Sequence, residues 1–184
     1  MDVGKTLDVR TRTAWREWLQ RNHAREKEIW LVYHAKASGR SSLAYNDAVD
    51  EALCFGWIDS TVKKLDADSR AQRYTPRRKG SPVSEMNRAR ARRLVRERRM
   101  TPAGRAALGS ALRLERLVVA SDIRRALRAD PGAWARFERL PAAYRRIRLG
   151  FIEGARGRPE VFKTRLRYFV RMTAQGKRYG MERG

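Results

Sequence analysis

Proline placement constrains the fold of this chain more than any other single feature. All six prolines of the 184-residue sequence lie at or beyond position 76, and four of them stand where a helix can begin: Pro102, Pro131, Pro141 and Pro159. Proline has no backbone N–H, so it is accepted in the first turn of a helix and disrupts a helix interior or a central strand. The pattern predicts three or four short helices over residues 121–176, with Gly176 ending the last one.

Apolar residues in this second part recur at helical spacing, which is enough to close a small helical core. The positions expected in that core are Leu127, Trp134, Phe137, Leu140, Tyr144, Ile147, Phe151, Ile152, Leu166, Phe169, Val170 and Met172.

The first part has a different pattern. We expect helices over residues 13–25 and 45–55, the first capped by Thr13, because apolar residues lie on one face of each. Residues 28–35, 57–65 and 70–75 are rich in β-branched and aromatic side chains, which favours strands, the last two forming a hairpin.

The predicted fold class is therefore α+β, with a small N-terminal three-stranded antiparallel-type sheet and two helices, followed by a C-terminal helical bundle. We expect an α+β domain over residues 1–80 and a basic helical part over 81–184, with 121–176 as its helical module. A basic linker rich in proline and glycine, residues 77–82, marks the change.

Charge is distributed unevenly along the chain. The net charge is +23, yet residues 1–69 hold 11 basic and 11 acidic side chains, so the whole excess lies in residues 70–184. Such asymmetry indicates an anionic partner, either nucleic acid or another polyanion. The alternative is a solvated surface that codon usage has enriched in arginine, since only eight of the 43 cations are lysine.

A candidate polyanion site lies in the basic linker and the helix that follows it. That helix is expected from Ser84 to about Arg99, and arginines spaced three or four residues apart would form a stripe along it. The residues proposed are Arg78, Lys79, Arg88, Arg92, Arg96 and Arg99. No zinc finger, RNA-recognition motif or helix-turn-helix pattern accompanies them, so binding would be largely independent of sequence. The alternative is an ordinary solvated helix face.

A second candidate is a pocket for a small anionic ligand at one end of the predicted hairpin. Its residues would be Trp57, Asp59, Ser60, Tyr74 and Arg77, where an Asp59–Arg77 pair would orient the guanidinium toward a carboxylate or phosphate. The alternative is structural: Trp57 belongs to the core, and Asp59 satisfies Arg77 or buried backbone groups.

No catalytic constellation is visible, so we expect a protein that is not an enzyme, without cofactor or catalytic residue. The histidines His23 and His34 share no metal-ligand spacing, and Cys54, the single cysteine, is expected to be a small buried side chain. No segment approaches the length of a membrane span and no secretory signal begins the chain, so we expect a cytoplasmic location. The sequence does not indicate an oligomeric state.

A series of motifs runs in order along nearly the whole chain: Trp15-x-x-Trp18-Leu19, Glu28-Ile29-Trp30-Leu31, Glu51-Ala52-Leu53-Cys54-Phe55-Gly56-Trp57-Ile58-Asp59-Ser60, Asp130-Pro131-x-x-Trp134-x-x-Phe137, Leu140-Pro141-x-x-Tyr144 and Gly176-Lys177-Arg178. These motifs resemble those of the YdeI/OmpD-associated (OmdA, bacteriocin-protection) family. The resemblance implies a role related to stress or bacteriocin protection. It implies no reaction, cofactor or catalytic residue.

Overall fold

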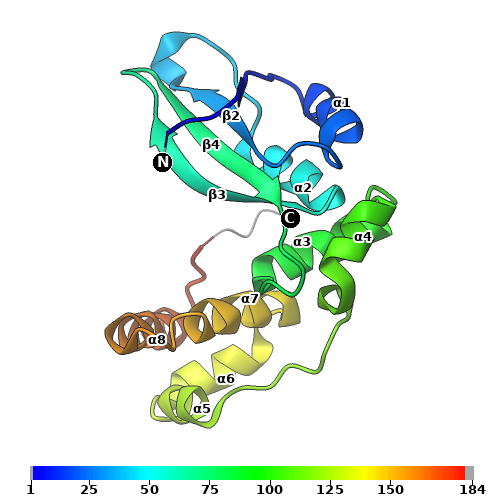
Figure 1. Ribbon diagram of the computed structural model, residues 1–184. Helices are drawn as coiled ribbons and strands as arrows, with labels where there is room; N and C mark the ends of the chain where they lie inside the picture. Colours follow the sequence, from blue (N-terminus) through cyan, green and yellow to red (C-terminus); the bar gives the residue numbers. More distant parts are fainter. Residues whose placement is uncertain (1, 181–184) are drawn as a thin grey trace. The chain divides into compact units, whose positions relative to one another are not determined.

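The computed structural model describes residues 2–180 and has an α+β architecture (Figure 1). The strands are β1 (Thr6–Leu7), β2 (Ile29–His34), β3 (Trp57–Lys64) and β4 (Ser69–Pro76). The helices are α1 (Arg12–Asn22), α2 (Tyr45–Cys54), α3 (Glu85–Arg96), α4 (Pro102–Leu108), α5 (Ser121–Arg128), α6 (Pro131–Arg139), α7 (Ala142–Glu153) and α8 (Pro159–Ala174), and two 3-10 helices occur at Lys36–Ser38 (η1) and Gly109–Leu112 (η2).

The sheet has four strands in the order β1-β2-β4-β3, one more than the three expected from the sequence. The three expected strands pair antiparallel, and the fourth, β1, pairs parallel to β2 along two residues only. A two-residue strand is too short to show the alternation by which strands are recognised in a sequence. The predicted hairpin is confirmed as β3 and β4.

The β3–β4 hairpin contains a bulge. Asp59 lies opposite Tyr74, whereas Val62 lies opposite Gln72, so β3 carries one residue more than β4 between these pairs. An extra residue inverts the side-chain alternation of the bulged strand beyond that point. Asp59 therefore shares a face of the sheet with Tyr74, and Lys64 shares the same face with Arg70 further along.

Helices α1 and α2 cover the face of the sheet that carries Tyr74. Trp15 of α1 is fully buried, and the centre of its ring lies 5.5 Å from the centre of the Tyr74 ring. Its indole N–H donates to the Ala48 carbonyl of α2 at 3.0 Å. These contacts join both helices and the sheet in one core. Helix α1 begins two residues earlier than expected, because the Thr11 side chain, rather than Thr13, caps it by accepting from the Ala14 amide.

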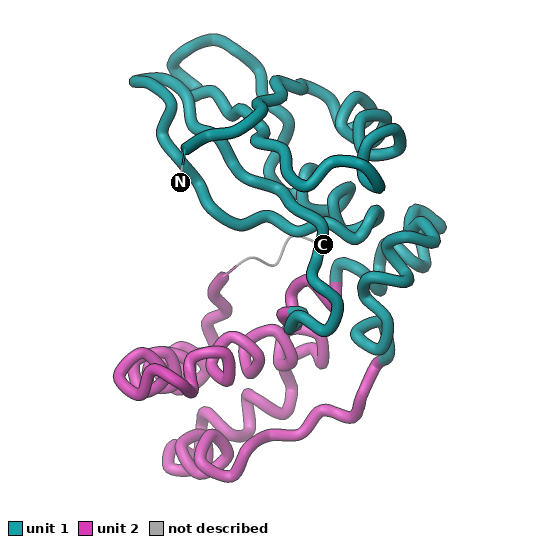
Figure 2. Tube along the Cα trace, viewed as in Figure 1, with its two compact units in different colours: residues 1–83, 90–113 teal, residues 84–89, 114–184 magenta. Residues whose placement is uncertain are grey.

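Contacts divide the chain into two compact units (Figure 2). The α+β unit comprises residues 1–83 and 90–113, and the helical unit comprises residues 84–89 and 114–184. Where a boundary near residue 80 was expected, residues 90–113 pack with the sheet and its helices instead. The buried side chains Ala91, Leu94 and Leu108 belong to the same core as Trp15.

Helix α3 ends at Arg96, one turn before the expected end near Arg99. Arg98 adopts a left-handed backbone with φ of 57°, and the amides of Arg99 and Met100 both reach back to the Leu94 carbonyl. This closing geometry is typical of helix C-termini, although glycine usually occupies the left-handed position. Arg99 therefore lies outside the helix and outside the expected stripe.

The helical unit contains four helices after residue 120, α5 to α8, within the range predicted from the prolines. Asp130 caps α6 by accepting from the Ala133 amide, and Pro131 and Pro159 stand in the first turns of α6 and α8. The core expected from the sequence is largely buried, including Leu127, Phe137, Tyr144, Ile152 and Phe169. Phe151 is an exception, because 45% of it is exposed.

Gly104 lets α4 approach the end of α2. A Cβ atom on Gly104 would overlap the Cys54 carbonyl and would lie 2.5 Å from the Met100 sulfur. We expect Gly104→Ala to lower the free energy of unfolding of the α+β unit by about 2 kcal/mol through overpacking. Urea unfolding followed by Trp fluorescence measures this, with the exposed Arg105→Ala on the same helix as control; equal effects of the two changes would contradict the packing role of Gly104.

Candidate functional site

Buried acidic side chains on α2 form the strongest electrostatic feature of the α+β unit. Asp50 and Glu51 are 3% and 0% exposed, and arginines from three other segments surround them. We call this the α2 acid–arginine cluster; its members are Asp47, Asp50, Glu51, Arg12, Arg16, Arg90, Arg93 and Arg99.

Glu51 lies at the centre of the cluster. Arg12 Nε donates to Glu51 Oε1 at 2.5 Å, Arg16 Nη1 donates to Oε2 at 2.6 Å, and Arg99 also bonds Oε1. Burial alone would raise the pKa of Glu51, but the hydrogen bonds from Arg12 and Arg16 and the charge of Arg99 outweigh it and hold that pKa below its ordinary value. Glu51 is therefore a buried carboxylate, which is stable only because it is paired.

Asp50 attaches helix α3 to the same cluster. Arg90 Nη1 donates to Asp50 Oδ1 at 3.1 Å, and Arg93 Nη2 donates to Oδ2 at 2.5 Å. Arg90 also donates to the Asn46 side chain at 2.6 Å. Sequence reasoning did not find these carboxylates, although adjacent acids in the middle of an apolar helix are a signal that cations must meet them.

The arginines of α3 therefore occupy two flanks of the helix. Arg90 and Arg93 face the acids of α2, whereas Arg88, Arg92 and Arg96, spaced four residues apart, follow the other flank. Arg96 is exposed, and Arg88 lies 3.5 Å from Glu85. Of the four arginines predicted to form the stripe, Arg88, Arg92 and Arg96 lie on α3. The fourth, Arg99, lies beyond the helix and is bound to Glu51.

The remaining residues of the predicted polyanion site, Arg78 and Lys79, precede α3. Both side chains are exposed in the connection between β4 and α3. This placement leaves them accessible to a large anionic partner.

The structure brings together part of the second candidate site. Tyr74 and Asp59 lie opposite each other on neighbouring strands, but Asp59 accepts a hydrogen bond of 2.7 Å from the Tyr45 hydroxyl of α2. Arg77 donates instead to the Pro82 carbonyl at 2.8 Å and to Ser81. Asp59 and Arg77 therefore do not form the pair predicted from the sequence; each hydrogen-bonds a different group.

Trp57 and Ser60 have separate surroundings. Trp57 is 1% exposed and donates its indole N–H to the His23 carbonyl at 3.2 Å, so it is a core side chain. Ser60 is exposed, and its carbonyl accepts from the Gln72 side chain beside the bulge.

Tyrosine hydroxyls gather around Asp59. The hydroxyls of Tyr33 and Tyr74 lie 3.2 Å apart, and Tyr45, which is 42% exposed, donates to Asp59. Burial raises the pKa of Tyr33 to about 12 and raises the pKa of Tyr74 further. These tyrosines stay neutral at physiological pH, so they can donate and accept hydrogen bonds but cannot serve as bases.

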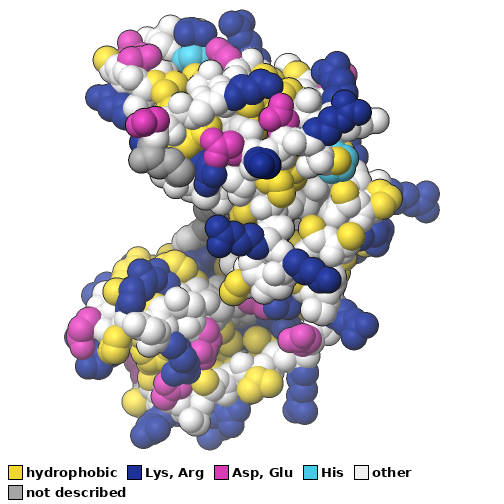
Figure 3. All heavy atoms as spheres, in the orientation of Figure 1, with side chains coloured by type: hydrophobic (Ala, Val, Ile, Leu, Met, Phe, Trp, Pro, Cys, Tyr) yellow, Lys and Arg dark blue, Asp and Glu magenta, His cyan; other side chains and the backbone are white. Residues whose placement is uncertain are grey.

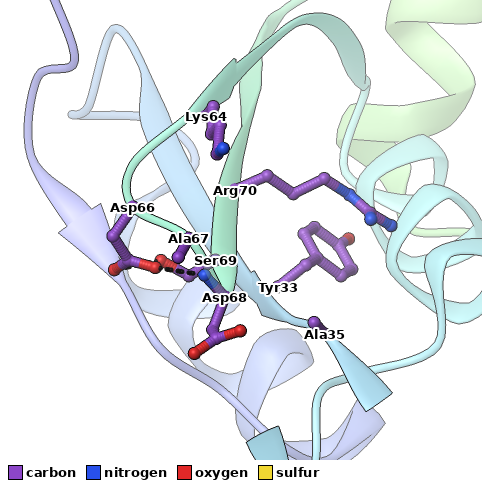
Figure 4. A pocket seen from close by; sticks show the side chains of 8 residues that line it. All are labelled: Tyr33, Ala35, Lys64, Asp66, Ala67, Asp68, Ser69 and Arg70. Carbon is purple, nitrogen blue, oxygen red and sulfur yellow. Dashed lines mark hydrogen bonds between the residues drawn. The ribbon is translucent and has the colours of Figure 1, made fainter. Parts of the chain in front are cut away.

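A pocket of about 180 Å³ opens at the turn end of the hairpin (Figure 4). It is lined by Tyr33, Ala35, Lys64, Asp66, Ala67, Asp68, Ser69 and Arg70. It lies at the opposite end of β3 and β4 from Gly56 and Arg77. Two cations and two carboxylates line it, so its charge favours neither anions nor cations.

The helical unit carries cations with few carboxylates. Residues 114–180 contain 17 Lys and Arg against 6 Asp and Glu. Ion pairs in the described part of this unit include those of Arg88, Arg156 and Lys163. Lys and Arg side chains project from much of the visible surface (Figure 3).

Residues 2–180 hold neither a metal-binding cluster nor a membrane-spanning helix. No cluster of three metal-ligating side chains occurs in this range. No helix within it has the length and apolar character required to span a membrane.

Two family models match the chain. Residues 7–107 match the family described as "Domain of unknown function (DUF8412)", and residues 116–176 match the family described as "Bacteriocin-protection, YdeI or OmpD-Associated". The resemblance noted from the sequence is confirmed for the C-terminal helices, and the motif from Glu51 to Ser60 falls within the first, separate match. No curated protein and no solved structure matches the chain.

The α2 acid–arginine cluster gives a stability prediction. We expect Glu51→Gln to lower the free energy of unfolding by about 3 kcal/mol at neutral pH, because three arginines lose their shared carboxylate. Because the pKa of Glu51 is lowered in the folded state, its contribution is present above its unfolded pKa of about 4.3 and is lost as pH falls through the folded value.

The measurement is urea unfolding of both proteins between pH 3 and pH 7. The difference between wild type and Glu51→Gln should shrink toward acidic pH. The exposed Glu97→Gln, which removes an acid paired with Arg93, is the control and should change stability little. A difference that does not depend on pH would contradict the charge of Glu51 as the cause.

Proposed function

This chain belongs to the family defined by the domain of unknown function DUF8412 and carries a YdeI/OmpD-associated module behind it, and on that premise we propose that it binds nucleic acid or another polyanion. We infer that the protein is not an enzyme and is located in the cytoplasm. Any protective effect against bacteriocins would then be indirect, because a chain of charge +23 repels cationic peptides at long range.

One observation carries the proposal: the cations of both units outnumber their acids, by 24 to 12 in residues 1–83 and 90–113, so the buried carboxylates of α2 neutralise only some of them. The carboxylates of α2 are matched by arginines at 2.5–3.1 Å, for example Arg93 on Asp50 and Arg90 on the same residue. Residues 114–180 hold 17 cations against 6 acids. An uncompensated positive surface attracts the phosphate backbone of nucleic acid and releases its condensed counterions on binding.

The proposed contact surface on α3 and its linker consists of Arg78, Lys79, Arg88, Arg92 and Arg96. Arg99 was included in the sequence-based prediction, but its bond to Glu51 leaves it less able to bind phosphate. If about six phosphates are neutralised, the logarithm of the binding constant should fall with the logarithm of salt concentration with a slope near −5.

Charge reversal tests this surface. We expect the triple change Arg78→Glu, Lys79→Glu and Arg96→Glu, at exposed positions, to weaken binding to fluorescein-labelled DNA at least tenfold and to flatten the salt slope by about three. Fluorescence anisotropy at low and physiological salt measures both quantities. The control is Lys5→Glu with Lys27→Glu in the acid-balanced first part; equal losses in both proteins would contradict a defined surface.

A small anionic ligand beside Asp59 is the second candidate function. Its support is the hydroxyl cluster of Tyr33, Tyr45 and Tyr74 around Asp59, which offers neutral donors next to a half-exposed carboxylate. Arg70, whose guanidinium lies 5.7 Å from the Tyr33 ring, would supply the positive charge.

Asp59→Ala separates the two functions. Under the polyanion proposal this change leaves the anisotropy titration unaltered, because Asp59 lies outside the proposed surface. Under the small-ligand proposal it abolishes the thermal stabilisation that a carboxylate or phosphate ligand gives to the wild-type protein. A screen of such anions by thermal shift, run on both proteins, distinguishes them.

A further inference from the structure

Two aromatic rings, on α7 and α8, lie open to solvent, and the sequence pattern predicted the one on α7, Phe151, to be a core residue. Phe151 is 45% exposed and Tyr168 is 39% exposed. Single exposed apolar side chains are ordinary, but exposed rings joined by continuous contacts form a patch of the kind that binds a partner. Both rings lie in the helical unit, where residues 114–180 hold 17 cations against 6 acids.

Arginines stack against both of these rings. The Arg165 guanidinium carbon lies 3.7 Å from the centre of the Phe151 ring, and Arg165 Nη1 donates to the Phe151 carbonyl at 2.6 Å. The Arg171 guanidinium lies 5.2 Å from the Tyr168 ring. Cation–π contact fixes the guanidinium plane while N–H groups at its edge stay able to donate.

Arg148 joins the two ring–arginine pairs. Its guanidinium carbon lies 5.8 Å from the Phe151 ring and 5.1 Å from the Tyr179 ring, and Tyr179 contacts Tyr168 edge-on at 4.6 Å. The contacts therefore run without a break through Arg165, Phe151, Arg148, Tyr179, Tyr168 and Arg171. We call these six residues the aromatic–arginine row.

Arg148 is the member whose position demands explanation. It is only 7% exposed, and its Nε has no hydrogen-bond partner among the described residues. Across residues 2–180, no carboxylate forms an ion pair with Arg148, Arg165 or Arg171. A buried cation surrounded by rings rather than by acids favours an external anion nearby.

We propose that the aromatic–arginine row binds single-stranded nucleic acid, with bases stacked on Phe151 and Tyr168, phosphates bound by Arg165 and Arg171, and the charge of the buried Arg148 attracting the phosphate backbone. Aromatic rings alternating with cations suit single strands, because unpaired bases offer their faces for stacking while the backbone needs positive charge. Duplexes keep those faces stacked internally, so the exposed rings would add nothing to their binding. This inference rests on the proposed polyanion function and assigns its substrate class and a second surface.

The test compares ligands of similar charge and different base exposure. Fluorescence anisotropy would measure binding of fluorescein-labelled oligo-dT and oligo-rU, a DNA duplex of the same length, and heparin as competitor, at physiological salt. The variants are Phe151→Leu with Tyr168→Leu, which removes the ring faces and keeps apolar side chains, and Arg165→Lys, which keeps the charge and removes the planar guanidinium. Controls are Val118→Ala and Arg139→Lys, exposed positions of the same unit outside the row.

We expect the ring variant to weaken single-strand binding by about tenfold or more, as loss of base stacking does elsewhere, while duplex and heparin binding change less than about twofold. Arg165→Lys should weaken single-strand binding in the same selective way, and equal effects for dT and rU would show that the sugar is not read. Circular dichroism confirms that each variant is folded.

The outcomes separate this inference from the function on which it rests. If no polyanion binds, both are wrong. If strands, duplex and heparin bind and the ring variant changes none of them, or changes all alike, the polyanion function stands and the row is overturned as a stacking site.

Discussion

Glu51 is the residue on which the α+β unit most depends. A carboxylate with no exposed surface would be expelled from the protein interior or protonated if it stood alone. Here Arg12 and Arg16 of α1 and Arg99 from the turn after α3 all donate to it. Glu51 therefore binds side chains as far as 48 residues away in the sequence, and together with Asp50 it holds α3 against α2.

The sequence was sufficient for much of the fold, because its signals are local. Proline at a first helical turn, an apolar stripe and a run of β-branched residues each depend on neighbours in the chain. Strand β1 was missed because two residues carry no pattern. The end of α3 was misplaced because Arg98, rather than glycine, adopts the left-handed backbone that ends the helix.

The candidate sites were less accessible from the sequence, because side-chain partners are set by tertiary contacts. Asp59 and Arg77 were expected to pair with each other. Instead, Tyr45, 14 residues before Asp59, donates a hydrogen bond to the Asp59 carboxylate. The Arg77 guanidinium donates to the Pro82 carbonyl. Phe151 fits a core stripe by spacing, but its ring is exposed beside Arg165. Buried acids of α2 bind Arg90 and Arg93 in the α+β unit, whereas Arg171 of the helical unit contacts an aromatic ring.

The path of the chain between the two compact units has a consequence for how the protein folds. Residues 84–89 belong to the helical unit, residues 90–113 return to the α+β unit, and the chain then enters the helical unit again. The Cα of Gly150 lies so close to Glu85 that an added Cβ would be 2.7 Å from the Glu85 Cγ, so this first segment is packed into its unit. The helical unit cannot be completed during synthesis until the last residues of the α+β unit have been made. When residues 84–89 pack against the later part of the helical unit, the intervening residues 90–113 are closed into a loop of the chain. Because these residues belong to the α+β unit, their ordering couples the folding of the two units.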